Sequence, residues 1–89
     1  MKQVTIYTLN YCPFCKKAKK ILRENNIPFN EIDITADEEV QTPLVAKKLG
    51  INGEITFPQI IIDEKQIGGC SDLEQLVING ELDNLLKEE

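Results

Sequence analysis

Apolar and polar positions alternate at the start of the chain and then change to a helical spacing. The run 4–8 is rich in β-branched and aromatic residues, which predicts a first strand. From Phe14 onward apolar residues recur on one helical face, Pro13 suits the first turn, and the Asn-Asn-Ile-Pro run at 25–28 ends the pattern. The chain is therefore predicted to open with a strand, a helix and, over 29–34, a second strand.

The middle of the chain carries the signals of a second helix. Thr42 followed by Pro43 has the residue types of a helix N-cap and first helical position, and Gly50 is a natural end. Residues 36–41 could add an earlier turn to this helix, but Pro43 would interrupt it. The helix is therefore expected to begin at Thr42.

The last third of the chain predicts a hairpin and a final helix. Strands are expected over 57–62 and just before the glycine pair at 68–69, joined by a turn at 63–64. The run 71–74 has the spacing of a capping box, so the final helix is expected to begin there. The apolar pattern extends past Gly80.

The predicted order of elements is β-α-β-α-β-β-α. A strand–helix–strand opening implies a right-handed parallel crossover, whereas the tight turn near the end implies an antiparallel hairpin. Together they predict an α/β fold with a mixed four-stranded sheet and helices on both faces, which is the thioredoxin-like arrangement. At 89 residues we expect one domain, 1–89.

The cysteine count and the charge narrow the classes of function. Three cysteines leave one unpaired in any disulfide scheme, which argues against a secreted disulfide scaffold. The first residues lack the apolar run of a signal peptide and no segment is long enough to span a bilayer, so we expect a reducing cytoplasm and no membrane partner. A net charge of −5 disfavours nucleic acid. We expect a monomer.

Two cysteines, Cys12 and Cys15, stand where the first strand gives way to the first helix. Cys12 faces the positive end of the helix, which favours its thiolate form and makes it the better nucleophile. Cys15 shares an apolar helical face with Ala18 and Leu22, so its thiol is expected to be buried and to act as the resolving thiol. This arrangement predicts thiol–disulfide exchange through a redox-active disulfide.

Three other interpretations of the pair were weighed. A zinc site needs about four ligands, and the chain offers three cysteines and no histidine. A purely structural disulfide would close too small a loop to stabilise the chain much. Two packed core cysteines would leave Pro13 and the helix start unexplained.

Four basic residues follow the pair and have two compatible interpretations. They are Lys16, Lys17, Lys19 and Lys20. They can form the solvated face of the first helix, or they can add positive potential near Cys12 that attracts anionic thiols or an acidic partner.

Four motifs together resemble those of a dithiol glutaredoxin. They are TIYT at 5–8, YCPFC at 11–15, TFPQI at 56–60 and IGGCSDL at 67–73. The resemblance covers nearly the whole chain and implies a glutathione groove beside Cys12. The residues that it assigns to glutathione binding are Phe14, Thr56, Phe57, Pro58, Gly69, Ser71 and Asp72.

The resemblance also implies a role for several of these residues. Pro58 would be in the cis form, and the backbone of Phe57 would pair with the cysteinyl part of glutathione like an added strand. Gly69 would permit close backbone approach. The N–H groups of Ser71 and Asp72 would hold the γ-glutamyl carboxylate at a helix N-terminus, and the Asp72 side chain would meet the amino group. These roles define the expected groove.

The third cysteine, Cys70, has a counterpart in some glutaredoxins. It would be a small packed group or a secondary thiol open to glutathionylation or to oxidative dimerisation.

Two positions depart from the family pattern. Many members carry lysine three residues before the nucleophile, where this chain has Leu9, and the segment 53–55 lacks the basic residue often found before the TxP motif. Each missing charge-assisted bond could cost about 1–3 kcal/mol if buried. We therefore expect weaker glutathione binding than in a typical member, unless Lys16 or Lys47 substitutes.

The expected function is glutathione-dependent thiol–disulfide exchange on glutathionylated and disulfide-containing proteins, with glutathione as co-substrate and no metal. One alternative is a redoxin reduced by thioredoxin reductase, motivated by the missing basic residues. A second is an iron–sulfur carrier in which two subunits hold a cluster through Cys12 and glutathione. Pro13 stiffens the motif and Cys15 competes for Cys12, which disfavours that alternative.

Overall fold

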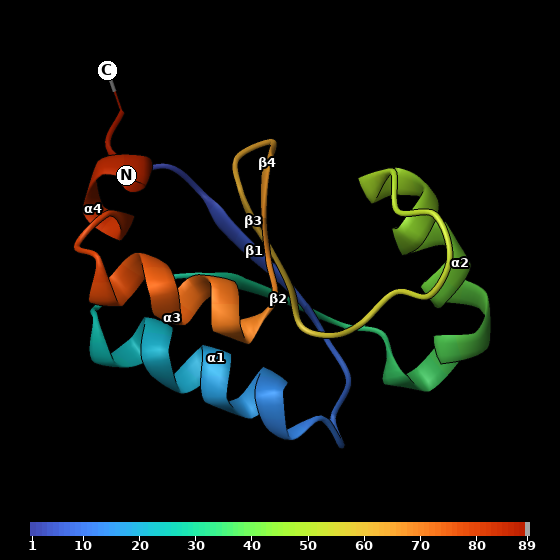
Figure 1. Ribbon diagram of the computed structural model, residues 1–89. Helices are drawn as coiled ribbons and strands as arrows, with labels where there is room; N and C mark the ends of the chain where they lie inside the picture. The colour runs from blue at the N-terminus through green and yellow to red at the C-terminus, as the bar shows by residue number, and fades with distance from the viewer. Residues whose placement is uncertain (89) are drawn as a thin grey trace.

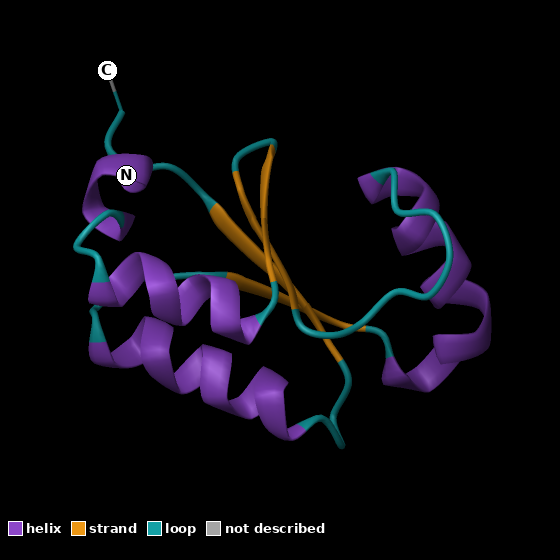
Figure 2. Ribbon diagram, in the orientation of Figure 1, coloured by secondary structure: helices purple, strands orange, loops and turns teal. Residues whose placement is uncertain are grey.

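The computed structural model describes residues 1–88, which form a four-stranded sheet between two helical layers (Figure 1). The strands are β1 (Val4–Thr8), β2 (Asn30–Asp33), β3 (Gln59–Ile62) and β4 (Lys65–Gly68). The helices are α1 (Pro13–Glu24), the 3₁₀ turn η1 (Thr35–Asp37), α2 (Glu38–Leu49), α3 (Cys70–Ile78) and α4 (Leu82–Leu86). Figure 2 shows α1 and α3 together on one side of the sheet and α2 alone on the other.

The sheet has the strand order β2-β1-β3-β4. β1 and β2 are parallel, with Thr5 opposite Asn30, and α1 forms the crossover between them. β1 and β3 are antiparallel, as are β3 and β4, with a register shift between Ile60 and Ile61. The predicted mixed sheet with helices on both faces is confirmed. Among residues 1–88, no helix is long and apolar enough to cross a membrane.

The main core lies between the sheet and the helices α1, α3 and α4. Alternation along β1 sends Val4 and Ile6 into this core and Tyr7 to the other face of the sheet. The N–H of Lys2 donates to the carbonyl of Leu86 at 2.8 Å, which ties the start of the chain to α4. The buried members of this core are Val4, Ile6, Ala18, Leu22, Ile27, Ile60, Ile62, Cys70, Leu73, Leu82 and Leu86.

A smaller core lies on the α2 side of the sheet. Its buried members are Tyr7, Leu9, Ile34, Val45 and Ile61. The half-buried side chains of Cys12, Leu49, Ile55 and Phe57 pack against them. Cys12 of the active-site loop and Phe57 of the loop before β3 therefore meet this second core rather than the first.

The expected start of α2 was wrong. The helix begins at Glu38, and Pro43 lies inside it. Two carboxylates in the first turn, Glu38 and Glu39, favour this earlier start because they face the positive end of the helix. Thr42 is thus a mid-helix residue, and its buried Oγ1 has no hydrogen-bond partner among residues 1–88. Gly50 ends the helix as expected, with φ +70°.

The expected start of α3 was also wrong, by one to two residues. Gly69 is the N-cap and Cys70 the first helical residue. The Asp72 carboxylate accepts the N–H of Gly69 at 2.9 Å, so the side chain that closes the cap is Asp72. Glu74, expected to close it, pairs instead with Lys17 of α1 at 3.2 Å. The apolar residues past Gly80 form a separate helix, α4, because Gly80 adopts a left-handed φ of +69°.

Candidate active site

Cys12 is the N-cap residue of α1. Its Sγ accepts the backbone N–H of Cys15 at 3.1 Å and lies 3.5 Å from the carbonyl oxygen of Phe57. The side chain is partly exposed. A sulfur that accepts an N–H at the positive end of a helix is in a position that stabilises negative charge, as nucleophilic attack requires.

Cys15 lies one helical turn further in and is 1% exposed. Burial, followed by the hydrogen bond with Cys12, raises the pKa of the Cys15 thiol to about 12. The Cys15 thiol therefore stays protonated at neutral pH in the resting protein. The expected difference in burial between the two thiols is confirmed.

The loop before β3 brings a proline to the redox pair. The Phe57–Pro58 peptide bond is cis, as the family resemblance implies, and the ring of Pro58 is fully buried. The carbonyl of Thr56 accepts the side-chain N–H of Gln59 at 2.7 Å, which fixes the loop on its outer side. Thr56 itself is exposed, whereas Phe57 is half-buried.

The start of α3 lies beside this loop. A Cβ atom on Gly69 would stand 3.7 Å from the carbonyl oxygen of Pro58, an ordinary contact, so protein atoms alone do not require glycine there. Ser71 and Asp72 are the second and third residues of the helix, whose first N–H groups have no partner within the helix. The Asp72 carboxylate is already engaged by the Gly69 N–H.

Gly68 is the glycine that the fold requires, and it was not among the expected site residues. Its φ is +113°, and a Cβ there would lie 2.5 Å from the Asp72 carboxylate. The double glycine was visible in the sequence, but which of the two is obligatory depends on the position of Asp72.

Two aromatic side chains stand out at the motif. Phe14 is 62% exposed and Tyr11 is 61% exposed. The Tyr11 hydroxyl donates to the Glu38 carboxylate, with distances of 2.6 and 2.8 Å to its two oxygens. No sequence signal pairs Tyr11 with Glu38, because the contact joins the active-site loop to a helix 27 residues later.

The structure shows the surroundings of Leu9, which stands where many family members have lysine, and of the two lysines that could substitute for it. Leu9 is 9% exposed and belongs to the α2-side core. Lys16 and Lys47 are exposed, and neither forms an ion pair within residues 1–88.

Cys70 is buried in the main core. It is 5% exposed, and burial followed by the charge of Glu74 raises the pKa of its thiol. Of its two expected roles, this setting favours the small packed group.

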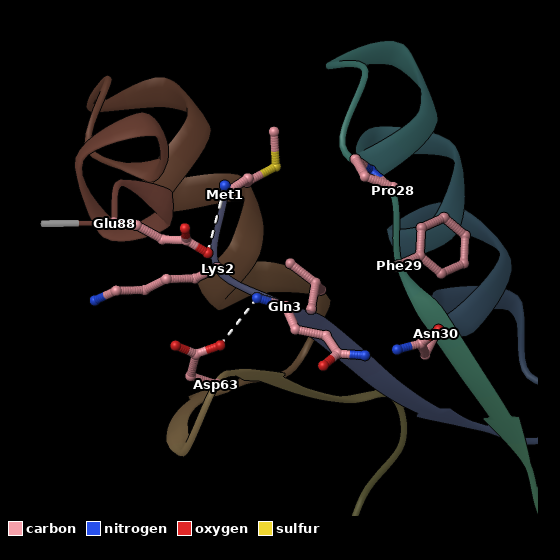
Figure 3. A pocket seen from close by; sticks show the side chains of 9 residues that line it. Met1, Lys2, Gln3, Pro28, Phe29, Asn30, Asp63 and Glu88 are labelled. Carbon is pink, nitrogen blue, oxygen red and sulfur yellow. Dashed lines mark hydrogen bonds and ion pairs between the residues drawn. The ribbon is translucent and has the colours of Figure 1, made fainter.

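Figure 3 shows a cavity at the other end of β1, between the N-terminus, the start of β2 and the β3–β4 turn. Its volume is about 520 Å³. Across its rim the Gln3 N–H donates to Asp63 at 2.9 Å, and the Met1 amine pairs with Glu88 at 3.5 Å. None of the expected site residues lines it.

Comparisons with known proteins point to one family. The glutaredoxin family model matches residues 4–67. Glutaredoxin 1 of Rickettsia bellii is 42% identical over 84 residues, covering 94% of this chain and 86% of that protein. Glutaredoxin 3 of Escherichia coli is 39% identical over 87 residues, covering 98% and 100%. The solution structure of a Brucella melitensis glutaredoxin superposes with a TM-score of 0.79 at 44% identity, covering 98% and 90%.

A mixed sheet with a CxxC pair at a helix start defines a thioredoxin-like oxidoreductase. Within that class, the family model and the relatives reported above are all glutaredoxins. The chain belongs to the glutaredoxin family and is a thiol–disulfide oxidoreductase.

Proposed function

We propose that this glutaredoxin reduces glutathionylated proteins and protein disulfides with glutathione as the reductant. The observation that carries the proposal is the asymmetry of the pair. The sulfur of Cys12 is partly exposed and accepts an N–H at a helix start, one turn from a Cys15 thiol that burial keeps protonated. Attack and resolution thus fall to different residues.

The reaction on a glutathionylated protein is two exchanges at one sulfur. The Cys12 thiolate attacks the sulfur of the glutathionyl group, a Cys12–glutathione disulfide forms, and the protein thiolate leaves. A second glutathione thiolate then attacks the glutathionyl sulfur, which yields oxidised glutathione and returns the Cys12 thiolate. Neither exchange requires Cys15.

A protein disulfide requires the second thiol. Attack by Cys12 joins the substrate to the enzyme and releases one substrate thiolate. Cys15 then gives up its proton as its sulfur attacks Cys12, so that a Cys12–Cys15 disulfide forms and the second substrate thiolate leaves. Two glutathione molecules reduce that disulfide. No metal takes part.

The proposed glutathione groove runs from Cys12 over the cis-proline loop to the start of α3. A Cβ atom added to Gly69 would stand only 3.7 Å from the carbonyl oxygen of Pro58, and this proximity supports a continuous surface between the two elements. The first N–H groups of α3, including those of Ser71 and Asp72, are suited to a carboxylate. The proposed contacts are Phe14, Thr56, Phe57, Pro58, Gly69, Ser71 and Asp72.

We further propose a reducing cytoplasm as the compartment and a monomer as the working unit. All three cysteines are free thiols, which suits a reducing compartment. The net charge of −5 argues against nucleic acid and anionic membrane surfaces as partners.

One specific alternative to glutathione as the reductant is thioredoxin reductase. Leu9 is buried in the α2-side core, and the segment 53–55 offers no cation, so two charge-assisted contacts to glutathione are missing. Turnover of a disulfide with NADPH and thioredoxin reductase, in the absence of glutathione, would favour this alternative, and no turnover would remove it.

The deciding experiment is glutathione-dependent reduction of a glutathionylated peptide. We expect Cys12→Ser to abolish turnover and Cys15→Ser to retain it, since only Cys12 is needed. Cys70→Ala is the matched control, because it removes a thiol outside the pair and should retain activity. Absence of wild-type turnover, in a protein whose Cys12–Cys15 disulfide can still be formed and reduced, would refute glutathione as the reductant.

A further inference from the structure

The hydrogen bond between Tyr11 and Glu38 places a carboxylate at the side chain of the residue that precedes the reactive cysteine. Tyr11 directly precedes Cys12, and its hydroxyl holds both oxygens of the Glu38 side chain at 2.6 and 2.8 Å. Glu38 is the first residue of α2, so the bond ties the active-site loop to the second helical layer. The same carboxylate raises the pKa of Tyr11, which remains a donor at neutral pH.

The Glu38 charge has no counter-ion. Within residues 1–88 no ion pair includes Glu38, and its neighbours Asp37 and Glu39 are also acidic. Leu9, three residues before Cys12, is apolar and buried and adds no positive charge. The surface at Tyr11 therefore carries the negative charge of Glu38.

The basic residues of α1 do not cancel this charge. Lys17 pairs with Glu74 at 3.2 Å and Lys19 with Glu31 at 2.8 Å, both away from α2. Lys16 is exposed on α1 and adds positive charge from the helix that begins at Cys12. Cys12 is thus preceded by a residue that holds a carboxylate and followed by a helix that carries an exposed lysine with no ion pair among residues 1–88.

We propose that Glu38, held by Tyr11, makes the enzyme select disulfides by charge, favouring those with a cationic group next to the reacting sulfur over those with a carboxylate. The inference rests on the proposed role of Cys12 as nucleophile. Tyr11 directly precedes Cys12, so a group bonded to the sulfur of Cys12 is exposed to the field of the carboxylate that Tyr11 holds. Basic peptides carrying a disulfide or a glutathionylated cysteine are the substrate class.

The test compares two small aliphatic disulfides of opposite charge, cystamine and 3,3′-dithiodipropionate. Reduced protein is mixed with an excess of either, the reaction is quenched with an alkylating agent, and the loss of alkylatable Cys12 is followed by mass spectrometry. In each case the Cys12 thiolate forms a mixed disulfide and one thiolate of the reagent leaves. No glutathione is present, so the result does not depend on which reductant the enzyme uses.

The quantity of interest is the ratio of the rate constant for cystamine to that for dithiodipropionate. We expect Glu38→Gln to lower this ratio about fourfold. The rate constant for cystamine should fall about twofold and that for dithiodipropionate should rise about twofold, which is the size of effect expected from one exposed charge. Glu24→Gln removes the same charge at the far end of α1 and should leave the ratio unchanged. Tyr11→Phe should lower it less than Glu38→Gln does, and the two changes should not be additive.

Each alternative outcome is informative. An unchanged ratio in Glu38→Gln would overturn the inference, and an equal change in Glu24→Gln would overturn it in favour of net charge alone. A wild-type Cys12 that reacts with neither disulfide would overturn both the inference and the proposed function. A ratio that shifts as expected, in a protein that glutathione fails to reduce, would sustain the inference and refute only the reductant.

Discussion

The two sides of the sheet are packed very differently, and the three thiols are divided between them. On the α1 and α3 side, one continuous core extends from β1 to α4. On the α2 side, few side chains are fully buried, and the apolar residues Val40 and Leu44 of α2 are 60% and 54% exposed. A helix that shows apolar side chains to solvent buries less surface and is held less firmly.

Thiol reactivity follows this difference. Cys70 belongs to the well-packed core, whereas Cys12 contacts the thinner core beside Phe57. Cys15 is 1% exposed. The reactive sulfur therefore lies where substrate has access, while the other two thiols are shielded.

The largest expected effect is in alkylation of the native protein. At pH 7, a thiol with a pKa of about 12 is ionised in on the order of one molecule in 10⁵, so Cys15 should react very slowly with iodoacetamide. Cys70 is also buried and burial raises the pKa of its thiol, so it should be protected as well. Mass spectrometry should find one alkyl group, at Cys12, in the reduced native protein.

Denaturant supplies the control, since all three thiols should react once the chain is unfolded. Rapid native labelling of Cys70 would contradict the assignment of this thiol to the well-packed side.

Matched truncations should separate the two sides by stability. Leu73→Ala removes a side chain that is fully buried in the main core and should lower the free energy of unfolding by about 3 kcal/mol. Leu49→Ala removes a half-buried side chain from the α2-side core and should cost about 1 kcal/mol. Urea unfolding followed by circular dichroism measures both. Equal losses would mean that the two cores contribute alike.

Sequence reasoning succeeded where a periodic pattern and a chemical motif coincide. Along α1 the buried residues Cys15, Ala18 and Leu22 follow the helical period, and the CxxC motif marks its start, so both the helix and the redox pair were predictable. The strand β1 was equally clear, because its side chains alternate between two buried faces.

It failed where local signals compete with tertiary contacts. Thr42 and Pro43 suggested a helix start, but α2 begins at Glu38, whose side chain is held by Tyr11. This contact joins residues 27 positions apart and leaves no periodic trace in the sequence. The start of α3 was missed for a different, local reason: the Asp72 carboxylate accepts the N–H of Gly69 three residues earlier, and this capping contact competed with the signal at 71–74.

The smallest predicted effect is the change in stability on replacing Pro43 inside α2, and it tests why the α2 side is less firmly packed than the α1 and α3 side. Pro43 has no N–H to donate to the carbonyl of Glu39, and its ring crowds that carbonyl, which weakens the helix from within. Pro43→Ala restores the donor, although it also frees the unfolded chain, which offsets part of the gain. We expect a net stabilisation of about 1 kcal/mol in urea unfolding. Pro28→Ala, in the exposed loop before β2, is the matched control and should not stabilise. If Pro43→Ala instead lowered stability, α2 would depend on the proline for its geometry, and the looseness of this side would have to come from its sparse core alone.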